Sequence, residues 1–233
     1  IKSIHEKSER SYGSPRVTKE LLKQGWKISD TKVARVMSRH NIYVKRKRKF
    51  IHTTDSKHNY KVCDNILNRN FDVDAINKAW VSDITYIPFG SSFIYLTIVM
   101  DLYDRAIIGW NLSKGMSTME TTIPALKNAI SNRPLSKTNE LIFHSDRGVQ
   151  YACHEFRNML NNHHCVQSMS RKGNCWDNAV AESFFKTIKS EKLNKVKIQS
   201  FQHAYSTIFR YIDGWYNTKR IHTHLNDLSP LEF

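Results

Sequence analysis

Long apolar runs are missing from this 233-residue sequence. No stretch reaches the roughly 18–20 apolar residues that a membrane helix needs, and no signal-peptide pattern is present. Cysteine is scarce: the four residues form no C-x-x-C pair, so neither a disulfide framework nor the paired ligands of a structural zinc site is indicated. These absences predict a soluble, cytoplasmic protein that does not span a membrane and whose thiols are reduced.

Acidic residues are outnumbered by basic ones. The chain has 21 Asp and Glu against 36 Lys and Arg, a formal net charge of +15, and residues 1–61 alone carry 17 basic and 5 acidic residues. A positive field favours nucleic acid through phosphate contacts and counterion release, whereas a merely solubilising surface is the alternative. Because the charge is concentrated in one segment, we expect that segment to bind nucleic acid.

The basic N-terminal segment contains two short amphipathic patterns. Residues 14–25 predict a helix with a proline at its start and a glycine at its end, and residues 28–40 predict a second helix with a Ser or Asp cap. This pattern is typical of a helix-turn-helix, although an ordinary helical hairpin has it too. We expect a small all-α DNA-binding domain over residues 1–44, whose second helix presents Lys32, Arg35 and Arg39 to DNA.

A block of five consecutive cations follows these helices. So dense a block is more typical of a nucleic-acid-binding arm than of a folded face. We interpret residues 45–75 as a basic linker that contacts phosphates without reading base sequence, through Lys45, Arg46, Lys47, Arg48 and Lys49.

The remainder of the chain alternates strand and helix patterns, which predicts an α/β domain. Period-two and apolar runs predict strands, and 3.6-residue periodicity predicts helices. The expected strands are 79–88, 93–101, 105–112, 140–145 and 166–169, and the expected helices are 117–131, 151–163, 178–193 and one within 200–217.

Two carboxylates lie in these strand patterns. Asp83 falls in the middle of a strand whose neighbours favour burial, where a lone carboxylate is costly unless it is paired, hydrogen-bonded or metal-bound. Asp146 ends a short apolar strand and is followed by the turn signal Arg147-Gly148. Both positions are candidate catalytic sites. Asp101 also ends a strand, but a turn-forming Asp explains it.

A third carboxylate, Glu182, lies near the start of the expected helix 178–193, for which Asp177 or Asn178 can serve as N-cap. Lys186 and Lys189 follow at i+4 and i+7, on the same face. An exposed salt-bridged face is the ordinary explanation of such a pattern. The presence of Asp83 and Asp146 favours a functional explanation instead.

At these residues the chain resembles the DDE proteins, the retroviral integrases and insertion-sequence transposases, and most closely the OrfB transposases of the insertion sequence three (IS3) family. Asp83, Asp146 and Glu182 occur in the order of the DDE triad, and 35 residues separate the second acid from the third. The motifs that carry the resemblance span nearly the whole chain: W-x-x-D-I-T-Y (80–86), H-S-D-R-G-x-Q-Y (144–151), G-N-C-W-D-N-A-x-A-E-S-F-F (173–185) and Y-N-T-K-R-I-H-T-H-L-N-D-L-S-P (216–230).

The resemblance implies a ribonuclease H-like integrase catalytic core with a C-terminal helical tail over residues 76–233. It also implies a transposase that cleaves DNA at the ends of a mobile element and transfers the 3′-hydroxyl to new DNA. Three hard oxygen donors predict two Mg²⁺ or Mn²⁺ ions, with Asp83 bridging both, Asp146 holding one and Glu182 the other.

The expected partner is double-stranded DNA, both the terminal inverted repeats and the target. We expect Lys189 and Lys186 to contact it near the metals, and Lys219 and Arg220 to contact it from the tail. The resemblance implies a homo-oligomer on DNA in a bacterial nucleoid. The sequence opens at Ile1 rather than Met, so an upstream OrfA-type partner or fusion is also expected.

Two other functions share parts of this pattern. A ribonuclease H-like nuclease without strand transfer would use the same carboxylates, but the basic N-terminal helices disfavour it. A non-catalytic DNA-binding regulator would be expected to have lost a triad carboxylate, and none is lost.

Overall fold

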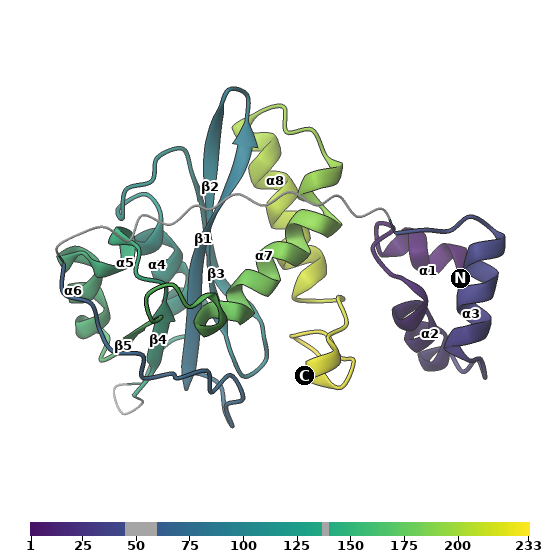
Figure 1. The fold of residues 1–233 in the computed structure, drawn as a ribbon, viewed down its shortest axis with the longest axis horizontal. Helices are drawn as coiled ribbons and strands as arrows, with labels where there is room; N and C mark the ends of the chain where they lie inside the picture. The colour runs from purple at the N-terminus through teal and green to yellow at the C-terminus, as the bar shows by residue number, and fades with distance from the viewer. Residues whose placement is uncertain (45–59, 137–139) are drawn as a thin grey trace.

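The computed structural model describes residues 1–44, 60–136 and 140–233 of the chain. Lys45 to Lys49, expected to contact phosphates, therefore lie outside the described residues. Three N-terminal helices pack around a small apolar core (Figure 1): α1 (Lys2–Lys7), α2 (Ser14–Lys23) and α3 (Asp30–Arg39). The Ser29 hydroxyl accepts a hydrogen bond from the backbone N–H of Lys32, so the cap expected for the second helix is confirmed.

A five-stranded mixed sheet forms the centre of the remaining chain, in the order β3-β2-β1-β4-β5. The first three strands are antiparallel neighbours, whereas β4 pairs parallel to β1, and β5 pairs parallel to β4. The strands are β1 (Ala79–Phe89), β2 (Ser92–Asp101), β3 (Ile107–Ser113), β4 (Ile142–Ser145) and β5 (Val166–Met169). All five expected strands are confirmed, and this order makes β1 and β4 central neighbours.

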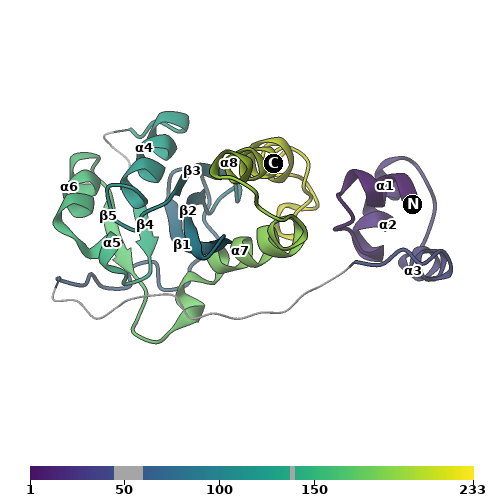
Figure 2. The ribbon, with the colours of Figure 1, turned by 90° about the horizontal axis from the view of Figure 1, so that it is seen from above.

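Helices cover both faces of the sheet, as Figure 2 shows from above. One apolar core packs α4 (Thr122–Asn132), α5 (Val149–Ala152) and α6 (His154–Asn162) on one face, and another packs α7 (Ala179–Glu191) and α8 (Phe201–Tyr211) on the other. Short helical turns complete the chain: η1 (Cys175–Asn178), η2 (Leu193–Lys195), η3 (Ile212–Tyr216) and η4 (Thr223–Leu225).

Two of the expected helices differ from those observed. The helix expected over 117–131 begins only at Thr122. The one expected over 151–163 is two helices, because the backbone of Cys153 is extended (φ −67°, ψ 159°) and breaks the helical hydrogen-bond ladder between them. The apolar side chains on either side of the break still face the same core.

Asp101 does more than form a turn. Its carboxylate is fully buried and accepts hydrogen bonds from the indole of Trp80 (3.1 Å), from Arg133 Nη1 (2.8 Å) and from the backbone N–H groups of Asn77 and Tyr103. A buried carboxylate is tolerated when it is paired and hydrogen-bonded in this way. The turn-forming role predicted from the sequence is thus only part of its structural role.

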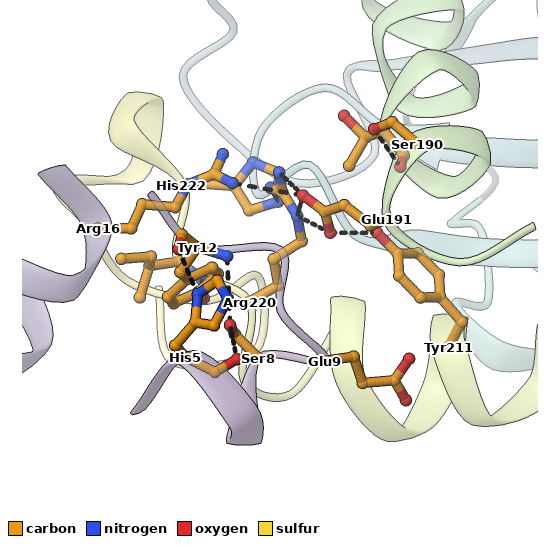
Figure 3. Close-up of polar contacts among 12 residues, drawn as sticks. His5, Ser8, Glu9, Tyr12, Arg16, Ser190, Glu191, Tyr211, Arg220 and His222 are labelled. Carbon is orange, nitrogen blue, oxygen red and sulfur yellow. Dashed lines mark hydrogen bonds and ion pairs between the residues drawn. The ribbon is translucent and has the colours of Figure 1, made fainter. Parts of the chain in front are cut away.

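The N-terminal helices contact the end of the chain and the end of α7 (Figure 3). Tyr12, which is buried, accepts a hydrogen bond at its hydroxyl from the backbone N–H of Ile221 (3.1 Å), and Ile221 itself belongs to the apolar core of the N-terminal helices. Arg16 on α2 pairs with Glu191, the last residue of α7, at 3.3 Å. We call this set of contacts the Glu191 junction.

Glu191 is the centre of the junction. Its carboxylate receives hydrogen bonds from the guanidinium of Arg220 (2.9 Å from Nη2), from the hydroxyl of Tyr211 (2.7 Å) and from Arg16. Burial alone would raise the pKa of Glu191, but the hydrogen bonds and charge of Arg220 outweigh it, so the pKa is lowered. One ionised carboxylate therefore holds together α2, α7, α8 and the C-terminal tail.

Candidate active site

The two strand carboxylates lie on adjacent parallel strands. Val81 of β1 is paired with His144 of β4, and two residues further along both strands come Asp83 and Asp146. Asp146 directly follows the end of β4, and its Oδ1 accepts a hydrogen bond from the backbone N–H of Gly148 (2.9 Å). The parallel register therefore brings two acids that are far apart in the sequence to neighbouring positions.

Glu182 reaches the same region because the start of α7 is fastened to β1. The side-chain amide of Asn178 donates a hydrogen bond to the backbone carbonyl of Ser82 (3.1 Å), the residue before Asp83. Glu182 follows in the first turn of α7. Asn178 occupies the N-cap position expected from the sequence, but its side chain makes this tertiary contact instead of capping the helix.

Charge interactions link the three acids. Burial raises the pKa of the Asp83 carboxyl well above its usual value, and the negative charges of Asp146 and Glu182 raise it further. The backbone N–H of Ile84 and the charge of Lys189 oppose this rise. Several like charges held together in a partly buried site are costly in themselves and are typical of a cation-binding or catalytic centre.

Lys189 and Lys186 differ in their surroundings. The ammonium of Lys189 donates a hydrogen bond to the hydroxyl of Thr85 on β1, and burial lowers its pKa against the opposing effect of Asp83. Lys186 has 67% of its side chain exposed and forms the ordinary i,i+4 ion pair with Glu182 (3.4 Å). Lys189 thus faces the carboxylates from within the site, and Lys186 lies at its edge.

The loop before α7 is held by a pair of arginines that bind Asp177. Arg171 donates to the Asp177 carboxylate from its backbone N–H and its guanidinium, and Arg69 Nε donates to it at 2.8 Å. These hydrogen bonds, those of Arg171 first, hold the pKa of Asp177 far below its ordinary value. Asp177 is fully buried, and the N-cap of α7 is Asn178, the other of the two residues that the sequence allowed. Because Arg69 lies 108 residues away in the sequence, no local pattern could have indicated this clamp.

The other residues expected to contact DNA differ in their exposure to solvent. Lys32, Arg35 and Arg39 are exposed on α3, and Lys219 is exposed in the tail. Arg220 is only 4% exposed, and its guanidinium is bound to Glu191. The sequence could not separate Arg220 from its neighbour Lys219, but the structure gives Arg220 a structural role in place of the expected DNA contact.

In the described parts of the chain, no three His, Cys, Asp or Glu side chains approach closely enough to hold one metal ion among them. Across the same residues, none of the helices combines the length and apolarity needed to cross a membrane.

Solved structures show the fold of the protein, and family models give its class. The HTLV-2 integrase catalytic core domain, in a structure titled as a complex with magnesium (trimeric form), matches with a TM-score of 0.50 at 18% identity, over 67% of this chain and 95% of that one. Two family models described as "Integrase core domain" match residues 74–175 and 163–230, and one described as "HTH-like domain" matches residues 1–50. The fold is the ribonuclease H-like fold, and the protein is a polynucleotidyl transferase of the DDE type.

Curated relatives then give the family. The transposase InsF for insertion sequence IS3A of Escherichia coli (strain K12) is 36% identical over 227 residues, covering 97% of this chain and 78% of that protein. The insertion element IS600 uncharacterized 31 kDa protein of Shigella sonnei is 38% identical over 234 residues, covering 100% and 85%. The chain belongs to the IS3 family of insertion-sequence transposases.

Proposed function

We propose that Asp83, Asp146 and Glu182 are the catalytic carboxylates with which this transposase cleaves DNA at the ends of its mobile element and joins the 3′-hydroxyl to target DNA. The observation that carries this assignment is the parallel register of β1 and β4, which brings Asp83 and Asp146 to neighbouring positions, while the hydrogen bond from Asn178 to Ser82 fastens the helix of Glu182 to β1. The charges of Asp146 and Glu182 add to the burial that raises the pKa of Asp83. The order of the three acids in the sequence supports it as well.

The donor set fits two divalent ions, Mg²⁺ or Mn²⁺. Carboxylate oxygens are the ligands these hard cations prefer, and a cation relieves the repulsion found at Asp83. Asp83 would contribute to both ions, Asp146 to one and Glu182 to the other. Each ion would then need only two of the three carboxylates, so the assignment does not require all three to converge on one point.

Such ions, when bound, activate a water or a DNA 3′-hydroxyl for attack and stabilise the departing 3′ oxygen. The chain's own residues position the DNA. Lys189 faces the carboxylates from α7 and would hold the reacting phosphate, with Lys186 contacting the strand at the edge of the site. No Ser or Tyr nucleophile is needed.

The proposed organisation is a helix-turn-helix-like DNA-binding domain over residues 1–44, a basic linker over 45–75 and the catalytic core with its tail over 76–233. Lys32, Arg35 and Arg39 would contact the terminal repeat, and the exposed Lys219 would contact phosphate. We also propose that the protein acts on the bacterial nucleoid as a homo-oligomer, with an OrfA-type product upstream.

Incubation with a duplex that carries the terminal repeat of its element, in Mg²⁺ or Mn²⁺, tests the proposal. We expect joined strands on a denaturing gel with the wild-type protein and none with Asp83→Asn or Glu182→Gln. Joining by either variant would refute the assignment. Cleavage without joining would mean that the protein is a nuclease only.

A further inference from the structure

Trp176 is an exposed aromatic residue on η1, the turn that directly precedes the helix of Glu182. Its side chain is 69% exposed, more than any other large hydrophobic residue in the described chain. Among the residues that the structure describes, its indole makes no hydrogen bond and no ring contact. By contrast, Trp80 is buried and donates to Asp101, and Trp110 donates to Asp213. The apolar surface of Trp176 therefore has no folding role to explain it.

The backbone around Trp176 is nevertheless firmly held. The next residue, Asp177, is fully buried in its clamp with Arg171 and Arg69, and Asn178 is fastened to the carbonyl of Ser82. Asn174, two residues before Trp176, accepts a hydrogen bond from Arg69 Nη2 (2.9 Å). The backbone of the turn that carries Trp176 is thus anchored, and this turn leads directly into the first turn of α7, which carries Glu182.

Exposed basic residues flank Trp176 along the chain. Lys172 is exposed in the preceding loop, the Arg171 side chain is 48% exposed even while bound to Asp177, and Lys186 is exposed on α7. An exposed aromatic ring among basic side chains is the usual composition of a surface that binds unpaired bases, with the ring stacking on a base and the cations contacting phosphates. An apolar protein partner would not be matched by so many cations.

We propose that Trp176 stacks on the 3′-terminal base of the cleaved DNA end and so holds that end at the carboxylates. This inference rests on the proposed function, because the cleavage step is what creates such an end. Within a duplex both faces of a base are covered by its neighbours, whereas the terminal base leaves one face open to an indole. Trp176 is then a binding residue specific for DNA ends.

Photocrosslinking tests the stacking directly. A terminal-repeat duplex with 5-iodouracil as its 3′-terminal base is irradiated with the protein in the absence of divalent metal, and the adduct is mapped by mass spectrometry. We expect the adduct at Trp176, and we expect it to disappear when the same base is moved well inside the duplex. An adduct on another residue, or one that is independent of the position of the base, would overturn the proposal.

Binding measurements with two variants supply a second readout. Fluorescence anisotropy should show that Trp176→Ala binds the cleaved end about 5- to 150-fold more weakly, while Trp176→Phe retains most of the affinity. Phe209→Ala is the matched control, because Phe209 is an aromatic residue that is 51% exposed on α8. An equal loss with Phe209→Ala, or no loss with Trp176→Ala, would contradict the stacking role.

The Glu182→Gln variant separates this inference from the proposed function. It should form the Trp176 adduct normally and join no strands. If it joins strands, the catalytic assignment fails while the stacking role stands. If the wild-type protein joins strands and Trp176 forms no adduct, the stacking role fails alone.

Discussion

At the scale of single residues, the electrostatic interactions within the candidate site destabilise the folded protein. Asp83 is held against two other acids and is partly buried, an arrangement that disfavours its charged form. Residues held in this way for function commonly reduce the stability of the fold. Activity and stability should therefore respond in opposite directions to the same substitution.

Asp83→Asn should abolish strand joining, by at least about 10³-fold, because it removes a ligand shared by both proposed ions. In metal-free buffer the same variant should be more resistant to unfolding, by about 1 kcal/mol, because one of the repelling groups is gone. Urea denaturation in a chelator measures this gain. Asp74→Asn is the control, since Asp74 is exposed and has no ion pair within the described residues, and it should change neither property. A less stable Asp83→Asn variant would argue against repulsion at the site.

Lys189→Ala should weaken binding of the DNA end by about tenfold or more, since it removes a charged contact to phosphate from within the site. Metal affinity, followed by calorimetry, should be nearly unchanged. Lys186→Ala should have the smaller effect on DNA, because that side chain is 67% exposed at the edge of the site. Loss of metal affinity in Lys189→Ala would place Lys189 in a different role.

At the scale of elements, the packing of helices on the sheet depends on a few close approaches. Gly109 in β3 lies directly beneath α4: a Cβ at this position would come within 2.4 Å of the carbonyl oxygen of Ala125 and 2.5 Å of the backbone nitrogen of Ala129. Both are backbone atoms of the helix, so they cannot rotate away as a side chain could. Only glycine allows the strand and the helix to meet at this distance.

Gly109→Ala should lower the free energy of unfolding by about 1–3 kcal/mol, because α4 must move off the sheet. Chemical denaturation measures the change. Gly214→Ala is the matched control, since a Cβ there meets nothing within 4 Å, and it should be close to neutral. Equal stabilities of the two variants would mean that the sheet and α4 adjust freely.

Sequence patterns predicted elements better than they predicted contacts. The strand carrying Asp83 was predictable because its alternation directly reflects the two faces of a sheet. The buried clamp of Asp177 and the burial of Arg220 were not, since each depends on a partner more than 25 residues away along the chain. A basic residue in a sequence is a candidate phosphate contact, but the fold can pair its charge with a carboxylate instead. Arg220 is such a case, because it is paired with Glu191.

At the scale of the whole molecule, the Glu191 junction gathers positive charge around one histidine. Burial, and after it the nearby basic groups of Arg220, Arg16, Arg105 and His224, together lower the pKa of His222 to about 3. Glu191, paired with Arg220, is the carboxylate of the same cluster. His222 is therefore neutral in the folded protein well below the pH at which it would ordinarily gain a proton.

Because the folded-state pKa of His222 is depressed, its contribution to stability is present above about pH 6.5 and is lost as the pH falls from about 6.5 towards 3. Between pH 7 and pH 5 the wild-type protein should lose up to about 2 kcal/mol more than His222→Gln, and less where solvent screens the partly exposed ring. Urea denaturation at the two pH values checks this. Parallel losses in both proteins would exclude His222 as the source.

Helix α7 connects the Glu191 junction to the proposed catalytic site. Glu182 stands in its first turn and Glu191 is its last residue, nine positions later, which is about 13 Å along a helix axis. A helix of this length is rigid. The basic helix α3 and the proposed catalytic carboxylate Glu182 are thus connected through α2, Arg16 and α7 as well as through the covalent chain. If the N-terminal helices bind a DNA end as proposed, a force on that end would be transmitted to Glu182.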